Sequence, residues 1–460
     1  MTMLLTVLDA GNLVVRELTL FSAIGFLFLG LSDLGVDLLY LWLRLKRLVQ
    51  GRARFVAATR PRAMQPGRIA IFIPAWDESA VIGAMLRHAI RAFGDSDYAI
   101  YVGCYPNDPA TAEAVRAVAS DKVRLVVGTR AGPTCKADCL NSLWRRMRED
   151  EATEGRRFKA IVLHDAEDVV HSAELDIFDA LIERFDLVQL PVLPLIDERS
   201  RWIAGHYIDE FAEAHGKEMV VREALGASIP SAGVGCVISR RAIEALAAAH
   251  GVPFDPGSLT EDYEIGLRLR AAGFPATFIR LPAGKGAPVI ATREYFPATL
   301  SAAVAQKARW MTGIALAGWD RLGWGSGMAE RWMRLRDRQS VLAALVLFAG
   351  YCALLLWPLL LFAGWSIGRA PEPFSRPVLI LLAINSVLLL WRLGIRFGFV
   401  AAIHGWREGV RAVPRVVTAN MVAMMAARRA VTRYVTMLWT GRAAVWDKTA
   451  HAFPDQIPAE

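Results

Sequence analysis

KAIVLHDAEDVV, residues 159–170, joins an apolar run to a cluster of acids. The run predicts a strand that ends abruptly at His164. Asp165, Glu167 and Asp168 then place three carboxylates within four residues. Such carboxylates repel one another unless solvent or a positive group lies among them. The stretch therefore predicts a strand whose carboxyl end faces a positively charged partner.

Strands and helices alternate on both sides of this stretch. Apolar runs predict strands at residues 69–73, 99–104, 123–127, 159–163 and 186–190. Apolar residues at helical spacing predict a helix that includes Val81 to Ile90, and further helices at 111–119, 136–147 and about 173–185. This alternation predicts an α/β domain with a mostly parallel sheet and helices on both faces. In such sheets, ligands bind at the carboxyl ends of the strands.

Three of the predicted strands end in polar clusters. They are Trp76-Asp77-Glu78, Tyr105-Pro106-Asn107-Asp108 and the acids that follow Leu163. The Gly-x-Gly-x-x-Gly loop of a dinucleotide site is absent after the first strand, so a mononucleotide is the favoured ligand. Clustered carboxylates without zinc-type ligands suit a hard cation such as Mg2+ or Mn2+. The alternative is a solvated acidic loop that caps the next helix.

Three apolar segments are long enough to cross a membrane as helices, because about 20 residues span the hydrocarbon core. They are Leu18–Leu43, Leu342–Trp365 and Val378 to about Ile395. The first segment is too long for a signal peptide and lacks its basic start and its cleavage site. A fourth segment, VVTANMVAMMAA at 416–427, is too short to span and predicts a membrane-surface helix.

Basic residues flank these segments on one side. They are Arg44, Lys46, Arg47, Arg52 and Arg54 after the first, Arg331, Arg334, Arg336 and Arg338 before the second, and Arg392 and Arg396 at the end of the third. The positive-inside rule then places the main domain in the cytoplasm, and the N-terminus and the turn GRAPEPFSRP outside. The predicted parts are an N-terminal transmembrane helix (1–50), a cytoplasmic domain (60–330), two transmembrane helices (340–400) and a basic cytoplasmic or interfacial tail (401–460).

The first apolar segment contains two acids, Asp33 and Asp37, on one helical face. Carboxylates at membrane depth are candidates for a functional role. Two interpretations remain open. The acids pair with Arg392 and Arg396 and hold the spans together, or they line a polar path for substrate or product.

The charge and the cysteines exclude other classes of protein. The net charge of +8, from 53 basic and 45 acidic side chains, lies largely beside the apolar segments, as in membrane proteins. No helix-turn-helix, zinc-finger or aromatic RNA-binding pattern is present, so nucleic acid is not an expected partner. The five cysteines form no paired framework, and Cys135 and Cys139 lack nearby zinc ligands, which predicts buried thiols.

SLTEDYEIGLRLRAAGF, residues 258–274, predicts an amphipathic helix that starts near three polar residues, Thr260, Glu261 and Asp262. On its own, this start is a plain capping pattern.

QKARW, residues 306–310, places Gln306, Arg309 and Trp310 on one face of a helix just before the membrane. Arginine offers a planar fork for phosphate, and tryptophan offers a flat apolar surface for a sugar ring. A tryptophan near a membrane also occurs as a simple anchor.

The combined motifs resemble those of the membrane-embedded family-two glycosyltransferases, which include cellulose, chitin and hyaluronan synthases and glucosylceramide synthase. In chain order they are IPAWDE (73–78), KADCLN (136–141), DAE (165–167), TED (260–262) and QKARW (306–310). The resemblance covers about residues 60–330, and QxxRW after TED is its specific part. It implies a GT-A-like nucleotide-sugar-binding domain flanked by transmembrane helices, in a bacterial inner membrane. Similar proteins often continue into a further regulatory domain where this sequence ends.

For the donor side of the site, the resemblance implies a UDP-sugar held by several residues. Glu78 and Asp108 would line the pocket for the base, and Lys136 would lie near the donor. Asp165 and Glu167 would hold Mg2+ or Mn2+ on the diphosphate. Because the usual second aspartate is a glutamate here, Asp168 is an alternative ligand to Glu167.

For the acceptor side, the resemblance implies that Asp262, with Glu261 beside it, is the general base. It would take the proton of the acceptor hydroxyl as that hydroxyl attacks the anomeric carbon with inversion. Gln306 and Arg309 would steady the pyrophosphate, and Trp310 would stack on the acceptor sugar.

The implied activity is that of a hexosyl- or N-acetylhexosaminyltransferase that extends an exopolysaccharide. Two alternatives remain: transfer of a single sugar to a lipid acceptor, and a catalytically silent membrane scaffold of an export complex or phage-attachment system. The spans contact membrane lipid, and three spans form a narrow channel at best. Extrusion of a polymer would therefore need a homo-oligomer or an outer-membrane or export partner.

Several other residues carry weaker signals. His164 and His171 flank the acids without metal-ligand spacing and are interpreted as surrounding structure. Gly233 and Gly235 either let a loop approach the acceptor or form a strand bulge. His451 has no role that the sequence supports.

Overall fold

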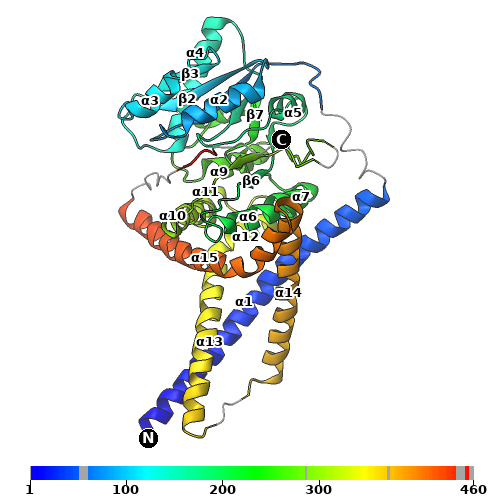
Figure 1. Ribbon diagram of the computed structural model, residues 1–460, viewed down its shortest axis with the longest axis vertical. Coiled ribbons are helices and arrows are strands. Elements are labelled where there is room, and N and C mark those ends of the chain that lie inside the picture. Colours follow the sequence, from blue (N-terminus) through cyan, green and yellow to red (C-terminus); the bar gives the residue numbers. More distant parts are fainter. Residues whose placement is uncertain (1, 51–60, 285–286, 370–372, 442–450, 455–460) are drawn as a thin grey trace.

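The apolar runs of the sequence form the central sheet of an α/β domain that stands on three long helices (Figure 1). The computed structural model describes residues 2–50, 61–284, 287–369, 373–441 and 451–454. Arg52, Arg54 and part of the turn GRAPEPFSRP lie outside these ranges. The start of α1 (Thr2–Val49), the end of α13 (Ser340–Ser366) and the start of α14 (Arg376–His404) lie at the end of the spans away from the α/β domain (Figure 1).

The central sheet has seven strands in the order β3-β2-β1-β4-β7-β5-β8. All five predicted strands are present, as β1 Ile69–Pro74, β2 Tyr98–Cys104, β3 Val123–Val127, β4 Ala160–Leu163 and β5 Leu187–Gln189. Two short strands were not predicted, β7 Cys236–Ser239 and β8 Ala276–Phe278. β7 pairs antiparallel with β4 and β5, and every other pairing in this sheet is parallel. The prediction of a mostly parallel sheet is confirmed.

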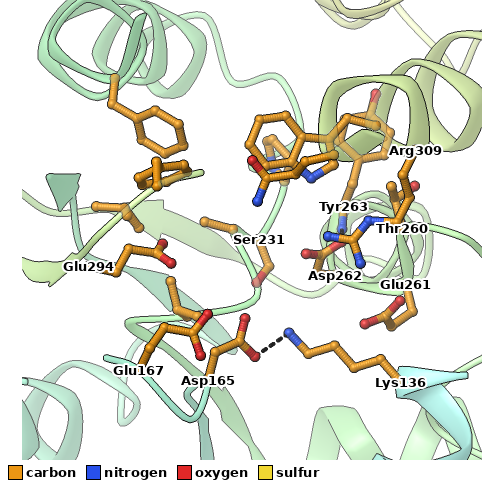
Figure 2. A pocket seen from close by; sticks show the side chains of 18 of the residues that line it. Lys136, Asp165, Glu167, Ser231, Thr260, Glu261, Asp262, Tyr263, Glu294 and Arg309 are labelled. Carbon is orange, nitrogen blue, oxygen red and sulfur yellow. Dashed lines mark hydrogen bonds and ion pairs between the residues drawn. The ribbon is translucent and has the colours of Figure 1, made fainter. Parts of the chain in front are cut away.

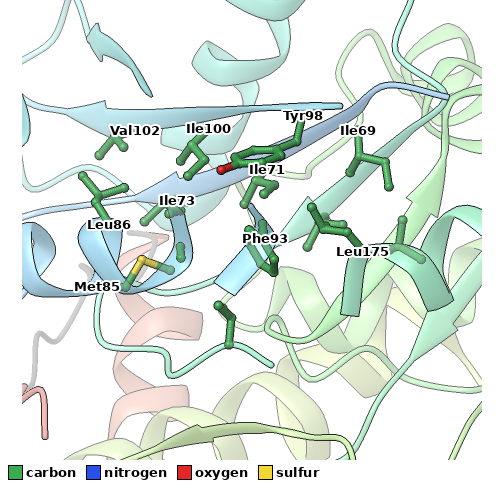
Figure 3. Packing of buried hydrophobic residues seen from close by; sticks show 14 of the residues in the cluster. Ile69, Ile71, Ile73, Met85, Leu86, Phe93, Tyr98, Ile100, Val102 and Leu175 are labelled. Atoms are coloured by element: carbon green, nitrogen blue, oxygen red, sulfur yellow. The ribbon is translucent and has the colours of Figure 1, made fainter. Parts of the chain in front are cut away.

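Helices cover both faces of the sheet, because side chains alternate between the faces along each strand. On one face, Ile71 and Ile73 pack with Met85 and Leu86 of α2 (Figure 3). On the other face, Phe72 packs with α4 in a second buried cluster. The helices of this domain include α2 Ile82–Phe93, α3 Pro109–Arg116, α4 Lys136–Glu154, α5 Glu174–Leu181, α8 Arg240–His250 and α9 Glu261–Ala271.

A second, two-stranded sheet lies between the central sheet and the spans. It pairs β6 Val192–Pro194 in parallel with β9 Thr292–Glu294. The segments around it carry α6 Gly205–Glu213, the π-helix η2 Ala214–Glu218, α7 Met219–Ala224, α10 Leu300–Trp310 and the π-helix η3 Met311–Ala317. Short helices α11 Gly318–Leu322 and α12 Met328–Arg338 then lead to the second span.

Three helices are long and apolar enough to cross a membrane: α1 Thr2–Val49, α13 Ser340–Ser366 and α14 Arg376–His404. α1 packs against both of the others. α1 is one helix of 48 residues that extends beyond the predicted span Leu18–Leu43 at both ends, so the bounds of the membrane-spanning part stay a prediction. Val36 and Leu39 of that predicted span pack with Val221 and Met333 of the helices beneath the α/β domain.

Ion pairs fix α1 to α14 and to the α/β domain. Asp33 bonds Arg392 of α14, as predicted, and also Arg336 of α12. Asp37 bonds Lys217 of η2 instead of the predicted arginine. That arginine, Arg396, bonds Glu213 of α6 at 2.6 Å. Asp33 and Asp37 are therefore both neutralised by partners at the junction, which favours the interpretation that they hold the spans in place.

The last helix, α15 Trp406–Thr440, extends well beyond the predicted membrane-surface segment 416–427 and packs against α14, α10 and α6. Its buried face carries small residues such as Ala426 and Ala430 that pack with Ala308 of α10. The opposite face exposes an apolar stripe at helical spacing, made by Trp406, Val410, Val413, Val417, Met421 and Met425. This stripe agrees with a position on the membrane surface, which stays a prediction.

Replacing Arg415 by Ala is expected to destabilise the protein by about 3–5 kcal/mol, because the change leaves the buried carboxylate of Asp209 without its ion-pair partner. Arg415 is 1% exposed and fixes α15 to α6 through Asp209 at 2.7 Å, and it also bonds Glu408 of its own helix at 2.7 Å. Thermal unfolding of the detergent-solubilised protein measures the loss. Arg428→Ala, an exposed position on the same helix, is the matched control. Equal melting temperatures for the two variants would contradict this role of Arg415.

Candidate active site

The carboxyl ends of β1 and β4 open into a cavity of about 270 Å³ that faces the second sheet and the helices above the spans. Figure 2 shows Asp165 and Glu167 on one side of this cavity and Asp262 with Arg309 on another. Nine of the ten predicted site residues line it: Glu78, Lys136, Asp165, Glu167, Glu261, Asp262, Gln306, Arg309 and Trp310. The structure therefore brings together segments that are far apart in the sequence.

The acidic loop after β4 presents two carboxylates to the cavity. Asp165 forms an ion pair with Lys136 at 2.5 Å, between Oδ1 and Nζ (Figure 2). Glu167 is 3% exposed, and its Oε2 atom has no hydrogen-bond partner among the described residues. Burial raises the pKa of Glu167 to about 8, although His451 beside it opposes the shift. The loop thus keeps one buried carboxylate oxygen without a hydrogen-bond partner in the described part of the chain.

The third acid of the loop, Asp168, has a structural task. Its Oδ2 atom bonds Nδ1 of His164 at 2.7 Å, and Nε2 of His164 bonds Glu174 at 2.6 Å. Burial opposes protonation, yet Glu174 and Asp168 together raise the pKa of His164 to about 10. Asp168 also accepts a hydrogen bond from the amide of Asp165, which fixes the loop. Asp168 does not line the cavity, whereas Glu167 does, so the alternative of Asp168 as the cation ligand has no support, and Glu167 as a ligand stays a prediction. His164 belongs to the supporting structure as predicted.

Helix α9 places Glu261 and Asp262 at its first turn, where both line the cavity. The simple capping interpretation fails for Thr260, because its side chain makes no capping hydrogen bond. Burial, followed by the charge of Asp262, raises the pKa of Glu261 to about 7. Gly233, at φ +78°, approaches so closely that a Cβ atom would lie 2.6 Å from Oδ2 of Asp262. The glycine loop therefore approaches the predicted base.

Helix α10 presents Gln306, Arg309 and Trp310 to the cavity. Oε1 of Gln306 and Nε of Arg309 are buried and lack a hydrogen-bond partner in the described part of the chain. Buried polar atoms without partners are rare, so both atoms are available to a ligand. The ring of Trp310 lies edge-on to Tyr207 at 6.0 Å between ring centroids, which fixes its orientation.

Asp108 is the one predicted site residue that does not line the cavity. Its carboxylate accepts hydrogen bonds from the amide of Asp77 at 2.6 Å and from the amide of Thr111 at 3.3 Å. Asp77 has a φ of +55°, a strained conformation for a residue other than glycine. The structure therefore assigns Asp108 the task of holding the turn that aims Glu78 at the cavity, and direct contact with a base stays a prediction.

Several residues of the cavity were missed from the sequence. Glu294 of β9 lies there because an unpredicted short strand carries it. His451 bonds Glu78 at 2.8 Å and Glu167 at 3.2 Å, both through Nδ1. No local pattern marks either residue, since the first depends on a three-residue strand and the second on a contact across 373 positions of the chain.

The charges of the cavity fit a divalent cation. Six carboxylates line it, from Glu78, Asp165, Glu167, Glu261, Asp262 and Glu294. Among the described residues that line it, Lys136 and Arg309 carry the permanent positive charges. Glu78, Glu167 and His451 each offer one ligand atom, and these atoms lie within 4.8 Å of one another. Carboxylate oxygens are preferred ligands of Mg2+ and Mn2+, so the residues present fit such an ion.

Comparisons with known proteins agree with this geometry. The model of the family described as "Glycosyltransferase like family 2" matches residues 66–313. "Bacteriophage adsorption protein B" of Escherichia coli (strain K12) is 37% identical over 92% of the chain. "Bacteriophage N4 adsorption protein B" of Escherichia coli O157:H7 shows the same identity and coverage. The chain spans 60% of the length of these curated relatives. A likeness to the bacteriophage N4 receptor, which WDE, YPNDPAT and WDKTAHAFP predict, is confirmed.

Among solved structures, the mannosyltransferase PcManGT from Pyrobaculum calidifontis resembles the chain, with a TM-score of 0.52 and 17% sequence identity. The match covers 90% of this chain and 99% of that one. PcManGT was solved in complex with GDP-Man and Mn2+. At this level of identity, the likeness establishes the shared fold.

Proposed function

The chain belongs to the family described as glycosyltransferase like family 2, and we propose that it is an inverting glycosyltransferase that moves a sugar from a UDP-sugar to a growing polysaccharide. The observation that carries this proposal is the convergence of acids, an unpartnered arginine and a tryptophan on one cavity above the spans. The basic flanks of the spans support a location of this cavity on the cytoplasmic side of a bacterial inner membrane.

On the donor side, Arg309 and Gln306 bind the pyrophosphate through the buried atoms that lack protein partners. Lys136 is a second cation for the phosphates, and its ion pair with Asp165 keeps its ammonium group at the cavity wall. Asp165 and Glu167 hold Mg2+ or Mn2+. When bound, such an ion neutralises the negative charge that develops on the leaving diphosphate.

On the acceptor side, Asp262 takes the proton of the attacking hydroxyl, and attack from that face inverts the anomeric carbon. Its place at the first turn of α9 holds the carboxylate on a rigid element beside Gly233. Trp310 offers a flat apolar surface, and Phe211 and Phe296 pack near it. This aromatic wall suits stacking against the faces of acceptor sugar rings.

Transfer of one sugar to a lipid is the second candidate function. Phe211, Met219 and Ile314 give one wall of the cavity an apolar character, which suits a lipid-linked acceptor. A catalytically silent membrane scaffold is the third candidate function, because the relatives are named for bacteriophage adsorption. A scaffold has no need of the unpartnered arginine and glutamine in a cavity lined by acids.

A donor panel tests the proposal. Membranes that contain the protein are given radiolabelled UDP-sugars and GDP-mannose with Mg2+ or Mn2+, and nucleotide release and label transfer are followed. Label in a polymer supports the proposed function, and label in a solvent-soluble lipid supports single transfer. Absence of transfer and of nucleotide binding would support the scaffold.

The pH dependence of kcat/KM should reflect the protonation state of Glu261. Because the pKa of Glu261 is raised to about 7, this side chain is neutral below that pH and negative above it. Its negative charge beside Asp262 favours proton removal from the acceptor, so kcat/KM is expected to fall as the pH drops through about 7. Glu261→Gln should lose this inflection. If the inflection persists in the variant, another titrating group of the protein causes it.

A further inference from the structure

A residue of the C-terminal tail lies inside the proposed donor site. His451 follows α15 in the sequence, yet it lines the cavity at the carboxyl ends of β1 and β4. Nδ1 lies 2.8 Å from Oε1 of Glu78 and 3.2 Å from Oε1 of Glu167. Both carboxylates are buried, at 6% and 3% exposure. One histidine nitrogen thus joins acids from two neighbouring strand ends.

The neighbours of His451 fix it there. Phe453, two residues further on, packs against the hydrophobic cluster of the sheet and lies 6.2 Å from the ring of His88. His88 is itself held by the carbonyl of Val170 at 2.9 Å. An apolar anchor so close in sequence makes the position of His451 a property of the fold.

The three side chains also have the spacing of cation ligands. Metal–ligand bonds of about 2.1 Å at right angles place two ligand atoms about 3.0 Å apart. The distances from Nδ1 to the two carboxylates, 2.8 and 3.2 Å, lie close to that value. Glu167 in addition keeps Oε2 buried without a hydrogen-bond partner in the described residues. That atom is a second, independent sign of a missing positive ligand.

We propose that His451 is a ligand of the divalent cation in the donor site, together with Glu78 and Glu167. The inference rests on the proposed function, because it concerns the cation held by the Asp165–Glu167 loop. It changes the expected task of Glu78 from contact with the base to contact with the cation. A nitrogen ligand favours Mn2+ over Mg2+, which prefers oxygen ligands. The tail thereby becomes part of the donor site.

Pulsed electron paramagnetic resonance of bound Mn2+ tests this directly, because an imidazole ligand gives a 14N coupling. The full chain in detergent is loaded with Mn2+, with and without UDP, as wild type, His451→Ala and His250→Ala. His250 is an exposed histidine at the end of α8 and serves as the matched control. We expect the 14N coupling in the wild type and His250→Ala and its loss in His451→Ala. The Kd for Mn2+ should rise at least about tenfold in His451→Ala.

The other outcomes separate this inference from the proposed function. Mn2+ bound to the wild type without a 14N coupling would overturn the inference and leave the proposed function standing. Tighter Mn2+ binding in His451→Ala would also overturn it, because His451 would then compete with the ion. No Mn2+ binding by the wild type, even with UDP, would contradict the metal site of the proposed function as well. Equal melting temperatures of the three proteins show that the substitutions leave the fold intact.

Discussion

Replacing Asp262 by Asn is expected to lower kcat by about 10²–10⁴-fold while nucleotide binding persists. The amide has nearly the same shape as the carboxylate but cannot take a proton from the acceptor hydroxyl. Asp262 lies at the first turn of α9, close to Gly233 and on the cavity wall, so the amide should keep its position. Initial rates with the donor identified from the panel, and UDP affinity by calorimetry, measure the two effects separately.

A matched substitution distinguishes loss of the base from loss of charge. Asp176→Asn makes the same chemical change at an exposed position of α5 and should keep the wild-type rate. Glu261→Gln removes an acid from the same turn but leaves Asp262 in place, and a smaller loss than that of Asp262→Asn is expected. A rate for Asp262→Asn within a few-fold of the wild type would transfer the role of base to another carboxylate of the cavity, such as Glu294.

Chelation of divalent cations is expected to abolish transfer, and Asp165→Asn to lower kcat/KM by at least about 100-fold. The physical reason is the excess of carboxylates in the cavity, which repels a nucleotide diphosphate unless a cation is present. Asp165 is the acid of the loop that reaches the cavity beside Lys136, and its side chain is 31% exposed. Restoring Mg2+ or Mn2+ to the chelated wild type should recover the rate.

Titration with Mn2+ separates binding of the cation from collapse of the site. Asp165→Asn should require a higher Mn2+ concentration for half-maximal rate, whereas the Asp176→Asn control should follow the wild type. Full activity of the wild type in excess chelator would rule out the cation. Lys136 and Arg309 would then have to neutralise the diphosphate on their own.

The sheet was predictable because its information is local. Strands buried on both faces read as short apolar runs, and the helices between them show helical spacing. These two patterns gave five strands of the central sheet and the edge at which the site would lie. β7 and β8 were not predicted, because strands of four and three residues are too short to show a recognisable apolar pattern. The antiparallel direction of β7 is set by pairing with its neighbours, which no single segment encodes.

At the junction between the spans and the domain, local sequence and long-range packing again decide different things. The sequence indicated that Asp33 and Asp37 need positive partners, because unpaired carboxylates in an apolar helix are costly. Asp33 bonds the predicted Arg392, but Asp37 bonds Lys217 of an unpredicted π-helix. The need for a partner is a property of the residue, whereas its identity depends on how η2 packs against α1.

By itself, the sequence determined the chemistry of this protein: the strand–helix alternation, the apolar spans and the acids, arginine and tryptophan of the site. Their side chains and spacing fix what each segment can do, because periodicity and charge are local properties. Tertiary structure alone decided which groups meet. In the folded chain, Asp108 holds the turn at Asp77 and does not line the cavity. His451 contacts Glu78 although 373 positions separate the two residues in the sequence. Such contacts depend on packing between distant elements, since the chain's local preferences do not fix its long-range neighbours.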